Sequence, residues 1–287
     1  MGTGGLAVAL IAALGLVPAA SAGTPDPTVN LGSAGPLEYL RTKYPQVVTQ
    51  AGPVTECEEN SLTGGGAAIG GSGKKGHLNA SGPVPAEESW IAEGRTADPD
   101  GETVTSWAIC GPGVVSRATS TENVGPNTSQ ANYSLACPSG EVPLSGGIVG
   151  TAGDPEILGT FPAMTPNAFT HSFANESPVD GEAVFTTLCA GYATTIRDKA
   201  TDVKEKRPGK AVAKCRSGEA VVGGGVKVTR GTVWQQDVPA LAIRPWDSPK
   251  DKGKTPEDGF YAKSFNGTNK RVTLTSYAVC ISLVDSA

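Results

Sequence analysis

Residues 215–225 read CRSGEAVVGGG, and residues 274–280 read LTSYAVC. The same two blocks occur earlier as CPSGEVPLSGG at 137–147 with VFTTLC at 184–189, and as CEENSLTGGG at 57–66 with VTSWAIC at 104–110. The odd-numbered cysteines recur at a period of about 79 residues, which is the mark of an internal repeat. The sequence therefore predicts three copies of one cassette, each of which opens and closes on a cysteine.

The stretch between the two blocks also repeats. Each copy has Pro-Ala followed by an aromatic strand, which reads SWIA at 89–92, FTHSF at 169–173 and FYAKSF at 260–265. Asp100-Gly101 and Asp180-Gly181 signal hairpin turns before the closing strands, and the paired glycines mark bulges or close backbone approach. We predict an all-β fold of three disulfide-stapled pseudo-repeats with about four antiparallel strands each.

The repeat divides the chain into segments. We expect a signal peptide at 1–22, an N-terminal leader segment at 23–54, cassettes at 55–111, 135–190 and 214–287, and linkers of a strand and a loop at 112–134 and 191–213. Pro36 to Tyr44 (PLEYLRTKY) is the best candidate for a helix.

Six cysteines allow 15 connectivities, and two of these treat all cassettes alike. The first pairs cysteines within cassettes, as Cys57–Cys110, Cys137–Cys189 and Cys215–Cys280. The second bridges the linkers and closes a ring, as Cys110–Cys137, Cys189–Cys215 and Cys57–Cys280. We favour the first, because each bridge would then join the first and last strands of one small sheet. Metal ligation is disfavoured, since no C-x2-C spacing occurs.

The N-terminus indicates export. Leu6 to Val17 are apolar and precede Ala20-Ser21-Ala22, which fits a signal peptide cleaved after Ala22. No later segment is apolar enough to span a membrane, so a secreted product is expected. The formal net charge of −5 offers no basic face for phosphates, which argues against a nucleic-acid partner.

The cassette pattern of Cys, Gly-Gly-Gly, aromatic strand and Tyr-Ala-Val-Cys resembles a repeat of secreted proteins from high-GC Gram-positive bacteria, most of which have no assigned function. The resemblance covers about residues 55–281. Three Gly-bearing four-stranded units are also similar in architecture to the β-prism of vitelline-membrane outer-layer proteins and some lectins. This likeness implies a pseudo-threefold β-prism-like arrangement of the cassettes, and it implies no site. Five Asn-x-Ser/Thr triplets fit the glycosylation acceptor, and a bacterial source would leave them bare.

Motifs for chemistry are weak. Gly71 to Gly76 matches G-x-G-x-x-G but lacks the strand–helix context of a dinucleotide site. The two histidines, His77 and His171, occupy non-equivalent positions in different cassettes, and His171 is predicted to be a packed residue. Three groups of acidic residues could supply the paired carboxylates of a glycosidase. The group Asp98-Asp100-Glu102 could instead bind calcium, although its position in a turn explains its Asp residues equally well. The groups are Glu58-Glu59, Glu87-Glu88 and Asp98-Asp100-Glu102. We therefore predict no catalytic residue, cofactor or metal site.

The tryptophans are the remaining functional candidates. Trp107 corresponds to Tyr277 and is expected in the core. Trp90, Trp234 and Trp246 are hypothesised to face a ligand, and the last two have planar polar neighbours such as Gln235 and Arg244.

These features favour a secreted, non-catalytic binding protein that recognises carbohydrate or a cell-surface or cell-wall component. The alternative is an extracellular structural or protein-interaction component, such as an envelope protein or an inhibitor. A hydrolase is the remote alternative.

Overall fold

The computed structural model describes residues 26–47, 52–70, 76–97, 101–113, 115–152, 155–163, 167–175, 177–230, 233–234, 238–248, 255 and 257–283. Within these ranges the chain forms antiparallel β-strands and no helix, and this confirms the all-β prediction. The expected signal peptide at 1–22 and the Gly71–Lys75 part of the glycine motif lie outside the described residues.

Each cassette contributes four principal strands, as expected. These are an opening strand with the glycines, a hairpin of two strands, and a closing strand that contains the second cysteine near its end. In cassette 1 they are β4 (Ser61–Ile69), β5 (Gly76–Pro83), β6 (Ser89–Thr96) and β7 (Glu102–Gly111). In cassette 2 they are β10 (Val142–Ala152), β11 (Pro155–Ala163), β12 (Ala168–Asn175) and β13 (Gly181–Ala190). In cassette 3 they are β16 (Glu219–Arg230), β18 (Ala240–Trp246), β19 (Gly259–Asn266) and β20 (Val272–Ser282).

Two further strands precede every cassette and complete it. They are β2 (Leu37–Val47) and β3 (Val54–Glu56), β8 (Ser116–Val124) and β9 (Thr128–Ala136), and β14 (Thr195–Val203) and β15 (Arg207–Lys214). The segments 112–134 and 191–213 thus hold parts of two strands each rather than one. The structural repeat is a unit of six strands, which we call unit 1 (37–111), unit 2 (116–190) and unit 3 (195–282). Two short strands stand outside it, β1 (Val29–Ala34) beside β2 and β17 (Val233–Trp234) beside β16.

Each unit is built as two layers of three strands, because its chain alternates between two sheets. In unit 1, β2, β7 and β4 pair in one sheet, whereas β3, β6 and β5 pair in another. The same division separates β8, β13 and β10 from β9, β12 and β11, and β14, β20 and β16 from β15, β19 and β18. Opening and closing strands therefore lie together in one layer, and the hairpin lies in the other.

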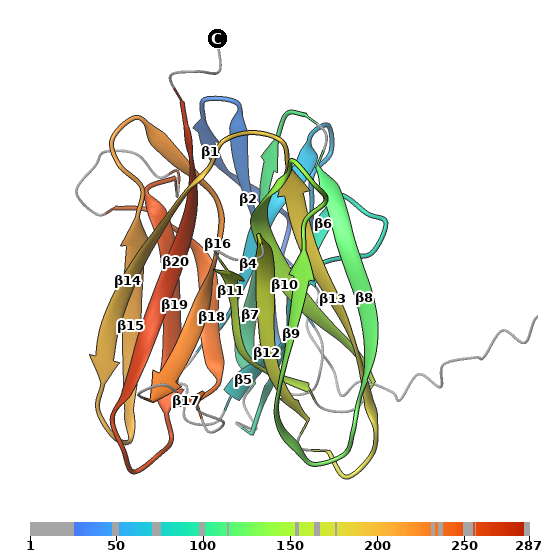
Figure 1. Cartoon of the computed structure of the whole chain (residues 1–287), viewed down its shortest axis with the longest axis vertical. Coiled ribbons are helices and arrows are strands. Elements are labelled where there is room, and N and C mark those ends of the chain that lie inside the picture. Colours follow the sequence, from blue (N-terminus) through green and yellow to red (C-terminus); the bar gives the residue numbers. More distant parts are fainter. Residues whose placement is uncertain are drawn as a thin grey trace, which may run out of the picture.

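The three units exchange layers in a closed ring. Sheet A joins the opening layer of unit 1 to the hairpin layer of unit 3 in the order β1-β2-β7-β4-β18-β19-β15. Sheet B joins units 2 and 1 in the order β3-β6-β5-β10-β13-β8, and sheet C joins units 3 and 2 in the order β14-β20-β16-β11-β12-β9. The strands run roughly along the long axis of the molecule (Figure 1). This cyclic exchange produces the pseudo-threefold arrangement.

The exchange overturns the hairpins that we predicted before the closing strands. Strand β12 belongs to sheet C and β13 to sheet B, so the chain at Asp180-Gly181 crosses between sheets instead of reversing within one. The same is true of β6 and β7 around Gly101. The hairpins lie one connection earlier, between β5 and β6, β11 and β12, and β18 and β19.

The helix expected at Pro36 to Tyr44 is also wrong. Residues 37–47 form β2, which pairs with β7 on one side and β1 on the other. These two ladders satisfy the backbone of the segment, and tertiary pairing of this kind overrides a weak helical propensity.

The glycine triplets are explained by close packing at three levels. A Cβ on the first glycine of the triplet, Gly64 in β4 or Gly223 in β16, would overlap the backbone of another unit's opening strand. The opening strands therefore approach one another at the centre of the molecule. A Cβ at the third position would overlap the neighbouring unit's hairpin strand in the same sheet. At the second position it would strike the buried ring of the unit's own hairpin. These pairs are Gly65 with Trp90, Gly146 with Phe169, and Gly224 with Phe260.

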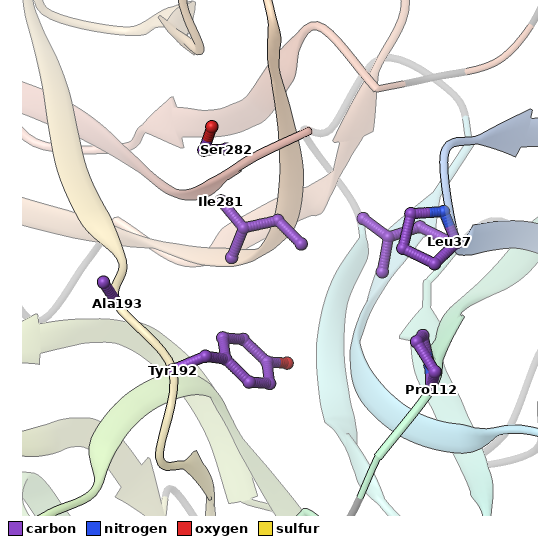
Figure 2. A pocket seen from close by; sticks show the side chains of 7 residues that line it. Leu37, Pro112, Tyr192, Ala193, Ile281 and Ser282 are labelled. Carbon is purple, nitrogen blue, oxygen red and sulfur yellow. The ribbon is translucent and has the colours of Figure 1, made fainter. Parts of the chain in front are cut away.

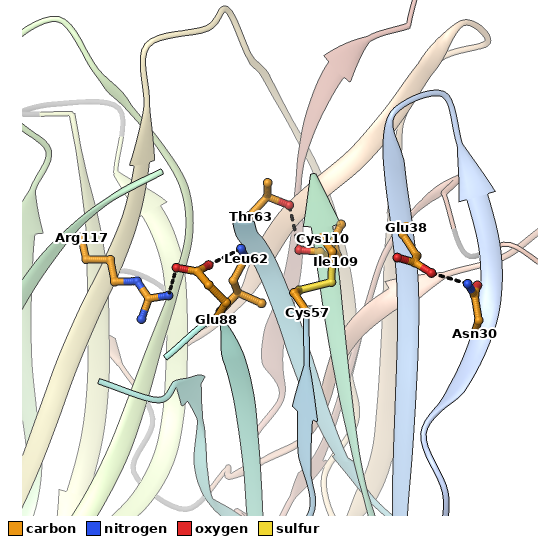
Figure 3. Close-up of a disulfide and its surroundings, with 9 residues drawn as sticks. All are labelled: Asn30, Glu38, Cys57, Leu62, Thr63, Glu88, Ile109, Cys110 and Arg117. Atoms are coloured by element: carbon orange, nitrogen blue, oxygen red, sulfur yellow. Dashed lines mark hydrogen bonds and ion pairs between the residues drawn. A yellow bond between two sulfur atoms is a disulfide. The ribbon is translucent and has the colours of Figure 1, made fainter. Parts of the chain in front are cut away.

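The cysteines form the pairs that we favoured, Cys57–Cys110, Cys137–Cys189 and Cys215–Cys280. The linker-bridging alternative is thereby excluded. The first cysteine of each pair follows a strand of the hairpin layer and the second lies in the closing strand. Each disulfide thus joins the two layers of one unit, as Figure 3 shows for Cys57 and Cys110. Three such bridges are typical of proteins of oxidising, extracellular compartments.

Two buried asparagines, Asn175 and Asn266, are the last residues of the aromatic strands β12 and β19. The Nδ2 of Asn266 donates to the carbonyls of Val203, Lys204 and Lys270, and its Oδ1 accepts from the Thr268 amide. Asn175 makes the equivalent bonds in unit 2. Both residues begin a glycosylation triplet, yet their amides are buried and occupied, so neither can carry a glycan in the folded protein.

A single apolar cluster runs through all three units, which therefore share one core. No helix of the described residues has the length and apolar character that crossing a membrane requires.

Candidate ligand-binding surface

A row of large side chains crosses the outer face of sheet A at the junction between units 1 and 3. Arg41 of β2 lies opposite Trp107 of β7, and Arg244 of β18 lies opposite Tyr261 of β19. Gly66 stands between the two pairs, opposite Trp107, and a Cβ on it would lie 2.7 Å from the Arg244 Cα. Because this central position has no side chain, Arg244 can lean across it. We call Arg41, Trp107, Arg244 and Tyr261 the sheet A cluster.

Arg244 is held between the two aromatic rings of this cluster. Its Cζ is 5.3 Å from the ring centroid of Trp107 and 4.8 Å from that of Tyr261. Its Nη1 donates to the carbonyl of Pro245 at 3.0 Å. Burial lowers the pKa of the Arg244 guanidinium, and the charge of Arg41 lowers it further, while Tyr261 opposes the shift. A guanidinium remains charged in spite of such shifts, so the cluster carries two positive charges.

Arg41 is the less satisfied of the two arginines. Its Nε is buried and has no hydrogen-bond partner. Neither Arg41 nor Arg244 forms an ion pair with a described residue, in contrast to Arg117, which binds Glu88 at 3.0 Å, and Arg197, which binds Glu219. A buried charged group normally has its hydrogen bonds satisfied, so Arg41 is the position of the sheet A cluster at which the described residues leave a donor unsatisfied.

The same row of positions on sheets B and C has a different chemistry. On sheet B it holds Thr119, Thr186, Gly147, Gly82 and Ile91. On sheet C it holds Asp198, Tyr277, Gly225, Phe161 and Thr170.

The sheet C row is aromatic but carries no arginine. The rings of Phe161 and Tyr277 stack at 5.8 Å, and Lys227 lies 5.0 Å above the Phe161 ring. Burial raises the pKa of the Tyr277 phenol, and Asp198 raises it further. A carboxylate therefore belongs to this row, so the unpaired positive charges of the sheet A cluster are not repeated on sheet C.

A second candidate is an apolar pocket of about 280 Å³ at one end of the molecule. The last residues of the closing strand of unit 3 meet there with residues that directly follow the closing strands of units 1 and 2, so the pocket lies where the three units converge (Figure 2). It is lined by Pro36, Leu37, Pro112, Tyr192, Ala193, Ile281 and Ser282. Burial raises the pKa of Tyr192 to about 12, so its phenol stays protonated at neutral pH.

The tryptophans singled out from the sequence do not form a site. Trp90 is 1% exposed and its ring fills the core of unit 1, where its Nε1 donates to Ser81. The hypothesis that it faces a ligand is therefore wrong, because the second glycine of β4 leaves room for the ring inside. Trp246 is half-buried beneath the Lys214 ammonium at 5.0 Å, and the side chain of Trp234 lies outside what the structure describes. The three residues belong to three different sheets.

The predicted carboxylate pairs are dispersed, and one of them is structural. Glu88 accepts from the Leu62 amide and pairs with Arg117 of β8, so it ties unit 1 to unit 2 (Figure 3). Glu87 accepts from the Ser89 hydroxyl, and Glu58 and Glu59 are exposed. Asp98 and Asp100 lie outside the described residues. His171 is buried beside aromatic rings, as its alternation with Phe169 and Phe173 indicated.

Sequence reasoning missed Arg41 and Tyr261 altogether and treated Arg244 only as a neighbour of Trp246. Trp107 is buried, as expected, but its ring lies on the outer face beneath Arg244. The alignment of cassettes contained a signal, since Trp107 and Tyr277 are equivalent and both lie in the same outer row.

Comparisons with known proteins provide no family. No protein-family model matches the chain, and no curated protein matches it. A solved structure described as the triple jelly roll fold and turret assembly in an archaeal virus is similar over 90% of this chain and 89% of that chain, with 9% identity and a TM-score of 0.20. A similarity at that TM-score supports no statement about this chain.

Proposed function

We propose that the protein is a secreted, non-catalytic binding protein that recognises carbohydrate through the sheet A cluster. The observation that carries the proposal is Arg244, a guanidinium fixed between two rings on the outer face of a rigid sheet. Planar polar groups set among aromatic side chains suit the mixed apolar and hydroxylated faces of sugars. The signal peptide predicted at 1–22 and the three disulfides support an extracellular location.

A binding role also agrees with the surroundings of Glu88, Glu219 and His171. Glu88 and Glu219 are engaged by arginines, and His171 is enclosed in the core.

Binding sites formed by strands of a scaffold are held more precisely than sites on loops. The sheet A cluster has this property, since each of its four residues lies within a strand.

The test is a glycan array and a polysaccharide pull-down with oxidised protein that starts after Ala22. We expect retention on a subset of polysaccharides and its loss in the variant Tyr261→Ser, because half of the aromatic clamp is then removed. The control is Arg271→Gln, which alters an exposed side chain of the loop before β20. Retention on no polymer would refute carbohydrate recognition. A single stoichiometric protein captured instead from culture supernatant would favour the interaction-component alternative.

A further inference from the structure

The sheet A cluster contains two like charges, and neither forms an ion pair with a described residue. Arg41 has a buried Nε without a hydrogen-bond partner, and Arg244 donates one hydrogen bond, from Nη1 to the carbonyl of Pro245. Withdrawing a charge from water is costly unless a counter-charge and hydrogen bonds replace the water. Two guanidinium groups on one face, neither of which forms an ion pair with a described residue, therefore leave a place for a counter-charge from a ligand.

The geometry of Arg244 restricts the chemistry of that ligand. Contact with the rings of Trp107 and Tyr261 restrains the position of the guanidinium. A planar fork of N–H donors matches the two oxygens of a carboxylate, which it can bind bidentately. Arg41, which is half-buried and has no ion pair with a described residue, adds a second positive charge on the same face.

The rest of the surface shows that this positive character is local. The chain as a whole carries a formal net charge of −5, so general basicity does not explain an unpaired arginine pair. The equivalent row on sheet B holds no charged residue, and the row on sheet C includes Asp198. The pseudo-threefold fold thus presents this arrangement once.

We propose that the sheet A cluster binds an acidic polysaccharide, with one sugar carboxylate held by Arg244 and Arg41 and with a single such site per chain. The proposal rests on the carbohydrate-binding function proposed above and specifies its ligand class. The carboxylate supplies the counter-charge, and the half-buried Tyr261 ring lies beside it as an apolar surface for the sugar ring.

The experiment compares an oligogalacturonide of defined length with its fully methyl-esterified form, measured by isothermal titration calorimetry. Both probes share one backbone, and only the first carries carboxylates. We expect the acidic probe to bind at one site per chain and at least tenfold more tightly than its ester, with affinity that falls as salt rises. Replacing Arg244 or Arg41 should weaken binding roughly tenfold to a hundredfold, because a hydrogen-bonded charge pair is lost.

The variants are Arg244→Gln, Arg41→Gln and Arg244→Lys, with Arg271→Gln as the matched control. Arg244→Lys keeps the charge but removes the planar fork, so this variant should bind more tightly than Arg244→Gln and less tightly than the wild type. Arg271→Gln removes the same charge from an exposed position of unit 3 and should leave the affinity unchanged. Thermal melts of every variant establish that the comparison is made on folded protein.

The outcomes separate this inference from the proposed function. Equal affinity for both probes, or an equal loss in Arg271→Gln and Arg244→Gln, overturns the carboxylate site while carbohydrate binding stands. Three equivalent sites per chain also overturn it. Binding of neither probe overturns the inference, and the glycan array then decides separately whether any polysaccharide is recognised. Preference for a sulfated polymer over the oligogalacturonide assigns the cluster to a different anion and overturns the carboxylate assignment.

Discussion

His171 makes the stability of the protein dependent on pH in a way that can be calculated. The imidazole is fully buried in unit 2, with ring centroids at 5.6 Å from Phe185 and 6.2 Å from Phe169. Its Nδ1 is 3.4 Å from the Thr160 hydroxyl, and its Nε2 has no hydrogen-bond partner. Burial lowers the pKa of His171 from 6.5 to about 3, because a charged imidazolium would lose its hydration there.

The sign of the effect follows from this pKa. Between about pH 3 and pH 6.5 the unfolded chain binds a proton at His171 that the folded chain does not bind. The free energy of unfolding therefore has its full value above pH 6.5 and falls as the pH is lowered toward 3. At pH 5 the loss is about 2 kcal/mol, since one pKa unit corresponds to about 1.4 kcal/mol.

The perturbation that isolates this contribution is His171→Leu, which keeps an apolar side chain in the site and removes the titrating group. Thr160 retains its hydroxyl bond to the carbonyl of Gly146 in the variant. Urea unfolding of the disulfide-intact proteins, followed by tryptophan fluorescence at pH 7, 6 and 5, gives the free energy of unfolding at each pH. The quantity of interest is the wild-type value minus the variant value.

We expect this difference to fall by about 2 kcal/mol between pH 7 and pH 5. The control variant Phe173→Leu changes packing in the same strand without removing a titrating group, so its difference from wild type should not vary with pH. A flat difference curve for His171→Leu would refute the reasoning, because His171 would then take up a proton equally well in the folded and unfolded chain.

Three further changes test the fold. Gly224→Ala places a methyl group against the aromatic ring beneath it and should lower the free energy of unfolding by about 1–3 kcal/mol or more, whereas Gly191→Ala meets nothing within 4 Å and should be neutral in thermal melts. Asn266→Asp removes the donor that serves three carbonyls and should cost about 2 kcal/mol or more in urea unfolding. The double variant Cys57→Ser/Cys110→Ser should lose about 2–5 kcal/mol, and an unchanged midpoint would show that this bridge does not constrain unit 1.

The repeat, the disulfides and the four strands of each cassette were predictable because their signals are local. A cysteine block followed by glycines recurs in order, and each closing strand carries the partner cysteine near its end. A turn signal is less informative about which strands pair. Asp180-Gly181 marks a connection correctly, but residues at a connection do not determine whether the next strand joins the same sheet. Here the closing strands pair with opening strands from earlier in the chain, and the predicted hairpins were wrong for that reason.

The sheet A cluster could not be predicted because its members come from both ends of the chain. Arg41 lies in the segment that appeared to be helical, and Arg244 lies in a stretch whose strand carries little alternation. They share a face only because unit 3 donates its hairpin layer to the sheet of unit 1. That closure of the ring is a tertiary property, and no spacing within one cassette contains it.

Repetition and difference along the three units also indicate where function should be sought. Positions that recur, such as the glycine at the middle of each glycine block and the ring beneath it, are filled in the same way because every unit packs equivalently in the shared core. The outer rows are free of that requirement, and there the units diverge into neutral, aromatic-acidic and aromatic-arginine surfaces. Packing does not demand an arginine with an unpaired Nε at a half-buried position, since Thr119 occupies the same place on sheet B. The departure from the repeat at Arg41 and Arg244 is therefore better explained by a ligand than by the fold.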